Sequence, residues 1–205
     1  MNLLQVLIKG GWLMIPIALS SLVVVALGVS RWLTLNRARR ELLNFASNWE
    51  HAPTAVDASR FRAACKIGPD VAAAMANILE EAALLPAEAS GRLESTAQRE
   101  LAQLESGLGA IATLAAITPL LGFLGTVTGM IKAFMQIQNL GGNVNANVLA
   151  GGIWEALVTT AAGLAVGILA LLVYNYLAGI IKDLARGLEN CGDIIIRILG
   201  RRHEA

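Results

Sequence analysis

Three long stretches without an ionisable side chain constrain this chain more than any other feature. They cover residues 10–30, 106–131 and 156–181, which are 21, 26 and 26 residues long. About 20 mostly apolar residues in a helix cross the hydrocarbon core of a bilayer. Each backbone N–H and C=O in lipid must be bonded inside the protein, which favours helices. The sequence therefore predicts an all-α membrane protein with three transmembrane helices.

Composition and residue types exclude several classes of protein. The chain is 56% hydrophobic and 15% charged, which is too apolar for a soluble domain. A net charge of +1 provides no bulk attraction to nucleic acid. The two cysteines, Cys65 and Cys191, fit neither a metal-ligand spacing nor a disulfide framework. Because the sequence offers no nucleophile–base set, metal cluster or phosphate-binding loop, we expect no enzymatic activity, metal or cofactor.

Basic residues are concentrated at one end of each apolar stretch. They are Arg31, Arg37, Arg39 and Arg40 after the first, Arg92 and Arg99 before the second, and Lys182, Arg186, Arg197, Arg201 and Arg202 after the third. The opposite ends carry only Lys9, and residues 133–154 contain no cation after Lys132. Cationic flanks remain in the cytoplasm. We therefore predict a periplasmic N-terminus, a periplasmic loop over 139–149 and a cytoplasmic tail.

The segments between the spans have helical periodicity. Residues 70–85 and 87–108 read as two helices separated at Pro86, which suits a first-turn position. The pattern of the second continues without a breaker, which predicts one helix over 87–138. A third helix is predicted over 150–200, joined to it by the turn-forming sequence NLGGNVNAN. Two of the helices are thus expected to be long, antiparallel and extended into the cytoplasm.

These patterns give a complete expected organisation of the chain. The segments are 1–32 for the N-terminus and first transmembrane helix, 33–108 for a cytoplasmic helical domain, 109–138 for the second transmembrane helix, 139–149 for the periplasmic loop, 150–181 for the third transmembrane helix, and 182–205 for a cytoplasmic helical tail.

Antiparallel helices allow the depths of polar residues to be compared. If Asn143 is the centre of the turn, Thr126 and Thr160 are each 17 residues from it. Lys132 lies 11 residues before it and Glu155 lies 12 after it. The polar groups of the second and third spans are therefore expected in matched layers, with the lysine and glutamate nearer the outer face.

Each of these groups has a structural and a functional interpretation. Glu155 is either a carboxylate at a helix end or a group lining a polar path, since carboxylates in membranes are costly. Lys132 either extends to the outer headgroups or pairs with Glu155. Threonines in spanning helices often bond only to the backbone. Together, however, the polar residues form a ladder unsuited to lipid: Thr126, Thr128, Thr159, Thr160 and Glu155.

Three spans provide too little surface to enclose a polar path within one chain. We therefore expect a ring-shaped homo-oligomer, with the second and third spans around its centre.

Two sequence stretches resemble a known family. They are TPLLGFLGTVTGMIKAF and GGIWEALVTTAAGLAVGILALLVYN, and they resemble the signature helices of the ExbB/TolQ/MotA family of proton-channel motor subunits. The resemblance covers residues 115–175 in detail and implies an inner-membrane ring, usually a pentamer. The ring surrounds a single-span partner of the ExbD/TolR type, which carries a membrane aspartate. Proton flow then drives a TonB- or TolA-like transducer.

The resemblance also implies roles for individual residues. Thr126 and Thr160 would face the pore near the partner's aspartate, and Glu155 matches the family's glutamate. Lys132 departs from the family pattern and is expected at the outer entrance. The positions that match as structural ones are Pro119, Gly122, Gly125, Tyr174 and Asn175. An ExbB-type role is favoured over a TolQ-type role in envelope maintenance, and a self-sufficient ion channel or scaffold is the alternative.

Overall fold

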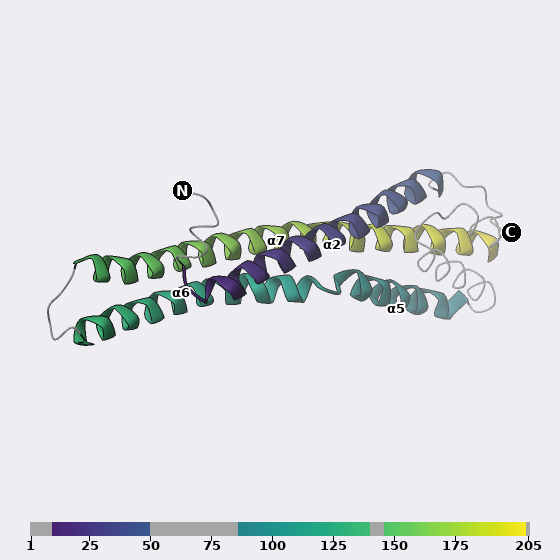
Figure 1. Ribbon diagram of the computed structural model, residues 1–205. Helices are drawn as coiled ribbons and strands as arrows, with labels where there is room; N and C mark the ends of the chain where they lie inside the picture. The colour runs from purple at the N-terminus through teal and green to yellow at the C-terminus, as the bar shows by residue number, and fades with distance from the viewer. Residues whose placement is uncertain (1–9, 50–85, 140–145, 204–205) are drawn as a thin grey trace. The chain divides into compact units, whose positions relative to one another are not determined.

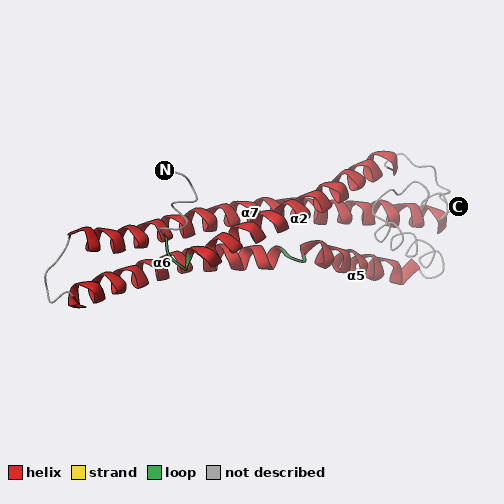
Figure 2. Ribbon diagram, in the orientation of Figure 1, coloured by secondary structure: helices red, strands yellow, loops and turns green. Residues whose placement is uncertain are grey.

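The computed structural model describes residues 10–49, 86–139 and 146–203, which form helices joined by short turns (Figure 1). The helices are α2 (Met14–Trp49), α5 (Pro86–Glu105), α6 (Leu108–Asn139) and α7 (Ala146–His203). No strand occurs in these described ranges (Figure 2), which agrees with the all-α prediction. The helix expected over 70–85 lies outside them.

Three segments are long and apolar enough to cross a membrane, as the sequence predicted. They are Met14–Arg40, Ala97–Asn139 and Leu149–Asn190. Their large apolar side chains are widely exposed, with Ile15 at 71% and Phe123 at 64%. A soluble protein rarely leaves so many contiguous apolar side chains in contact with water. Their exposure fits a surface that lipid or other subunits cover.

Proline and glycine define where two of the helices begin. α5 begins at Pro86, in the first-turn position where a missing N–H leaves no bond unmade. α2 follows a tight turn in which the Met14 N–H donates to the Gly11 carbonyl at 3.1 Å. Gly11 has a φ of +73°, a left-handed conformation that glycine adopts without a steric penalty.

The prediction of one unbroken helix over 87–138 is wrong. α5 ends at Glu105 and α6 begins at Leu108, so a turn separates them. Gly107 in this turn has a φ of +83°. Glycine in this conformation commonly terminates helices because it has no Cβ to clash with the backbone. The apolar periodicity continues across the turn, which is why sequence pattern alone did not reveal the break.

Alanine at Gly107 is expected to destabilise the fold by about 1–2 kcal/mol, because an L-residue with a side chain is strained at positive φ. Gly109 provides a matched control two residues away. It lies inside α6 with open space around it, so alanine there is expected to stabilise by ~0.5–1 kcal/mol. Equilibrium unfolding in mixed detergent micelles measures both changes. Equal effects of the two substitutions would contradict the role given to Gly107.

The chain divides into two compact units. The first contains α2 up to Val29, all of α6, and α7 up to Asn175. Within it α6 and α7 run side by side (Figure 1), with contacts from Gly122 to Gly163 and from Ala133 to Gly152. The start of α2 packs on the same pair, where a Cβ at Gly28 would lie 2.9 Å from Val173 Cγ1. This unit contains every residue of the expected site.

The second unit contains the remainder of α2, α5 and the remainder of α7. Its buried apolar side chains in α2 and α7 are Leu35, Leu177, Ile180, Ile181, Leu184 and Leu188. Arg39 of α2 lies 3.9 Å from Asp183 of α7, and Arg186 lies 3.4 Å from the same carboxylate. The expected helix after the third span is confirmed, since α7 runs without interruption to His203.

Candidate functional site

A seam of small residues joins α6 to α7 at the centre of the first unit. The facing pairs are Gly122 with Gly163, Gly125 with Thr159, Gly129 with Ala156, and Ala133 with Gly152. Successive contacts are three or four residues apart on α6, and three or four residues apart in the opposite direction on α7. Small residues at this spacing let helix backbones approach closely within a membrane. The register agrees with the depth calculation made from the sequence.

The closest approach of the two helices is at Gly163. A Cβ on Gly163 would lie 2.7 Å from Gly122 Cα and 2.8 Å from the Thr118 carbonyl oxygen. Both atoms belong to the α6 backbone, so neither can move aside as a side chain would. Gly122 and Gly125 are buried in this seam, which gives two of the expected structural positions a physical reason.

Pro119 fits against a third glycine of α7, Gly167. A Cβ on Gly167 would lie 2.5 Å from Pro119 Cγ and 3.3 Å from the Ala115 carbonyl oxygen. Proline has no N–H, so it cannot bond the carbonyl four residues earlier, which is that of Ala115. Gly167 thus leaves room for the proline ring and for the carbonyl that this ring leaves without its helical partner. α6 continues through Pro119 without a break in helical structure.

The threonine hydroxyls are engaged by carbonyl groups. Thr126 donates to the Phe123 carbonyl at 2.6 Å, and Thr128 donates to the Gly125 carbonyl at 3.2 Å. Thr160 differs from them, because its hydroxyl donates across the helix interface to the Gly122 carbonyl at 2.9 Å. Each of these hydroxyl protons is therefore used in a bond to the backbone, as the structural interpretation of the threonines expected. Each hydroxyl oxygen can still accept a hydrogen bond.

Thr126 and Thr160 share one flank of the α6–α7 pair. Thr160 bonds to Gly122, and Thr126 is four residues from Gly122, or about 40° around α6. Both threonines are half-buried. Large apolar neighbours on the two helices include Phe123 and Leu164, which are exposed. A small polar region therefore lies on an otherwise apolar flank of this unit.

Lys132 and Glu155 form an ion pair between α6 and α7. Lys132 Nζ donates to Glu155 Oε1 at 2.7 Å, with side-chain exposures of 49% and 24%. Of the two interpretations that the sequence left for Lys132, the structure therefore shows the pairing. The pair adjoins the Gly129–Ala156 contact of the small-residue seam, since Lys132 is three residues after Gly129 and Glu155 directly precedes Ala156.

The turn before α2 packs against this ion pair. The Thr159 hydroxyl lies 2.9 Å from the Gly10 carbonyl oxygen and 2.6 Å from the Glu155 carbonyl oxygen, and either can accept its proton. A Cβ on Gly11 would overlap the Glu155 carboxylate. This contact was not predicted from the sequence. The adjacent glycines at the start of the first apolar stretch were the available signal, since glycine allows a close backbone approach.

The polar residues therefore form two groups instead of the single ladder expected. Glu155 and Thr160 are five residues apart, which places them about 140° apart around α7. One group contains Lys132, Glu155 and Thr159 with the turn before α2. The other contains Thr126 and Thr160 on a different flank. Sequence depth identified the layers correctly but carried no information about which side of the helix pair each group faces.

The remaining expected residues lie away from both groups. Tyr174 is half-buried and Asn175 is exposed. They follow Thr160 by about four helical turns, or ~21 Å at 1.5 Å per residue. The described residues contain no group of three or more His, Cys, Asp or Glu side chains placed to hold a metal ion.

The Lys132–Glu155 pair is expected to show a measurable coupling. Lys132→Met or Glu155→Gln alone leaves one partner without its counter-charge, whereas the double variant removes both. The coupling energy in a double-mutant cycle is expected to be about 1 kcal/mol. Equilibrium unfolding in mixed micelles gives the three differences, and strictly additive single effects would show that the pair contributes nothing.

Comparison with known proteins agrees with this architecture. The sequence profile described as the MotA/TolQ/ExbB proton channel family matches residues 66–190. A protein named ExbB-like 3 from Synechocystis is 32% identical over 200 residues, covering 90% of each chain. ExbB-like 1 from the same organism is 46% identical over 43% of this chain. The biopolymer transport protein ExbB of Neisseria gonorrhoeae is 38% identical over 49% of this chain.

The extent of these matches differs among the relatives. The chain spans 35% of the length of ExbB-like 1 and 46% of the Neisseria protein. The family profile covers more than half of the chain, and the match to ExbB-like 3 covers 90% of both proteins. With three apolar helices, these matches indicate a multi-pass membrane protein. The chain belongs to the MotA/TolQ/ExbB proton channel family.

Proposed function

We propose that this chain is the ring-forming subunit of a motor driven by the proton-motive force. The observation that carries the proposal is the pair Thr126 and Thr160, which share one level and one flank of α6 and α7. A polar region on an apolar, membrane-spanning surface is costly unless protein or water covers it. The helices that the structure describes leave these two threonines only half-buried, which supports assembly around an axis.

In this proposal the ring is a homo-oligomer, with a pentamer expected from the family. Its centre holds the single-span helix of a partner of the ExbD/TolR type, whose membrane aspartate takes up and releases protons. Thr126 and Thr160 form the polar wall beside that aspartate. Their hydroxyl oxygens can accept a bond from the protonated carboxyl group. Glu155 and Lys132 lie nearer the outer end, where we place the entrance of the proton path.

The orientation in the membrane that we propose rests on the arginines after the first span. A periplasmic N-terminus and a cytoplasmic C-terminus in the bacterial inner membrane are supported by the positive-inside rule. The motion would pass to a TonB-like transducer that energises transport across the outer membrane. The names of the relatives favour this ExbB-type role, since they include biopolymer transport proteins. A TolQ-type role in envelope maintenance is the other outcome within the family.

Co-expression with a single-span protein of the ExbD/TolR type tests the assembly. We expect the purified chain to form a closed ring, and the complex to gain the mass of the partner's helices inside it. Native mass spectrometry with and without the partner measures both masses. A ring whose mass is unchanged by the partner would favour a self-sufficient channel or scaffold and contradict the proposal.

A further inference from the structure

The second half of α2 carries two arginines that form no ion pair with another described residue. Arg39 lies 3.9 Å from Asp183. Among the described residues no ion pair involves Arg37 or Arg40, and both are exposed. Arg31 is half-buried and is two residues before Leu33, about 200° away around the helix. Two exposed guanidinium groups on α2 are therefore available to an anion from outside the chain.

These two arginines continue an apolar face of the same helix. Exposed side chains at Leu22, Val29 and Leu33 have exposures of 69%, 52% and 47%. At 100° per residue they lie within about 80° of Arg37 and Arg40. Leu22 and Leu33 are ~16 Å apart along the axis, about half the ~30 Å thickness of a hydrocarbon core. The apolar part of this face is thus about as long as one leaflet of the hydrocarbon core is thick, and it ends at two positive charges.

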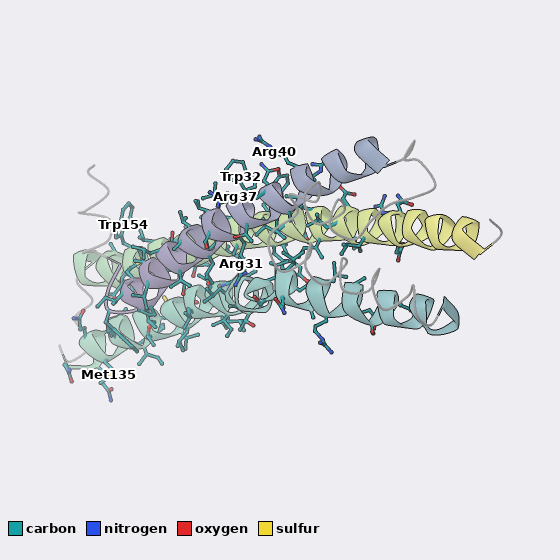
Figure 3. The ribbon with its side chains drawn as sticks, turned by 90° about the vertical axis from the view of Figure 1, so that its right-hand side faces the viewer. Arg31, Trp32, Arg37, Arg40, Met135 and Trp154 are labelled. Atoms are coloured by element: carbon teal, nitrogen blue, oxygen red, sulfur yellow. The ribbon has the colours of Figure 1, made fainter. Side chains whose placement is uncertain are left out.

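Trp32 marks the level at which this apolar surface meets polar surroundings. It is 41% exposed and precedes Leu33 directly. Tryptophan is enriched where the hydrocarbon core meets the headgroups, because its ring is apolar and its N–H is polar. Figure 3 shows Trp32, Arg37 and Arg40 along the same part of α2, with Arg31 on another side of the helix.

We propose that Leu33, Arg37 and Arg40 form a binding site for an anionic phospholipid, with Trp32 at its edge, about 80° from Arg40 around α2. The two guanidinium groups would bind the phosphate and the added negative charge of the headgroup, since guanidinium matches phosphate oxygens in geometry. The acyl chains would lie along Leu33 and the apolar face before it. The apolar approach favours a lipid over an acidic soluble protein, which would leave that face uncovered. This site is independent of the proposed proton path.

Fluorescence quenching of Trp32 tests the site in the full-length oligomer. The variant W12F/W49F/W154F leaves Trp32 as the single tryptophan. The protein is reconstituted into bilayers that contain both phosphatidylglycerol and phosphatidylcholine, with one or the other brominated. One arginine near an anionic membrane contributes about 1 kcal/mol, which is ~fivefold in relative affinity. We expect brominated phosphatidylglycerol to associate with Trp32 at least about fivefold more strongly than brominated phosphatidylcholine.

Two further variants separate the site from general charge attraction. R37Q/R40Q is expected to reduce the preference to about one, because each removed charge weakens headgroup binding. R39Q is the matched control on the same helix, since Arg39 already has Asp183 beside it, and its preference should remain. Excess inorganic phosphate at constant ionic strength should also leave the preference for phosphatidylglycerol unchanged. Equal quenching by both lipids would overturn the proposal. So would a preference for phosphatidylglycerol that falls as far in R39Q as in R37Q/R40Q, or that falls when phosphate is added.

Discussion

Alanine at Gly163 is expected to separate α6 from α7 and to lower the free energy of unfolding by about 1–3 kcal/mol. The added Cβ would meet Gly122 Cα at 2.7 Å and the Thr118 carbonyl oxygen at 2.8 Å. Ordinary contacts of a Cβ are longer, so one helix backbone has to move. Because the small-residue seam is continuous, a shift at its narrowest point also disturbs the neighbouring contacts. Larger residues at Gly163 should prevent assembly altogether.

Gly151 provides the control for this prediction. It lies in α7 as well, but no atom lies within 4 Å of the position that its Cβ would take. Gly151→Ala should therefore be neutral or slightly stabilising, since alanine has the higher helix propensity. Equilibrium unfolding in mixed micelles compares the two variants directly. If Gly163→Ala were as stable as Gly151→Ala, the close approach of α6 and α7 would be wrong.

Valine at Thr160 is expected to lower proton flux through the assembled complex by about 10- to 100-fold. Valine has the shape of threonine but no hydroxyl, so the partner's protonated carboxyl group would be left without an acceptor, which costs ~1–3 kcal/mol. Serine restores the hydroxyl and should retain most of the flux. The measurement is dye-reported acidification of liposomes that contain the complex, after a membrane potential is imposed.

Thr118→Val controls for the loss of a hydroxyl as such. Thr118 is fully buried, and its hydroxyl donates to the Leu114 carbonyl at 2.6 Å within α6. Its replacement removes a similar bond in the same helix pair, at a position that no partner can reach. Flux should therefore persist in Thr118→Val. Normal flux in a fully assembled Thr160→Val complex would remove Thr160 from the proton path.

The sequence was most informative where regular periodicity decides the structure. The three spans, the start of α5 at Pro86 and the uninterrupted α7 all follow from apolar spacing and from where proline is tolerated. The depth calculation succeeded for the same reason, because two regular antiparallel helices keep a constant rise per residue. It placed Lys132 level with Glu155, and the structure joins them.

Features that depend on packing were not predictable in this way. The break at Gly107 interrupts no apolar pattern, so only its left-handed conformation reveals it. The small residues of α6 were recognised, but their α7 counterparts Gly163 and Gly167 were not. The contact of Gly11 with Glu155 joins residues 144 positions apart, and the adjacent glycines 10 and 11 do not identify the partner that approaches them. The division of polar residues into two groups likewise depends on helix rotation.

The most direct test of the central claim is proton flux with and without the partner. The chain is reconstituted in liposomes alone, with a single-span partner of the ExbD/TolR type, and with a variant of that partner whose membrane aspartate is changed to asparagine. We expect potential-driven proton flux only with the unaltered partner, at least about tenfold above the other two samples. Equal flux from the chain alone would show that it conducts without a partner and would contradict the proposed motor subunit.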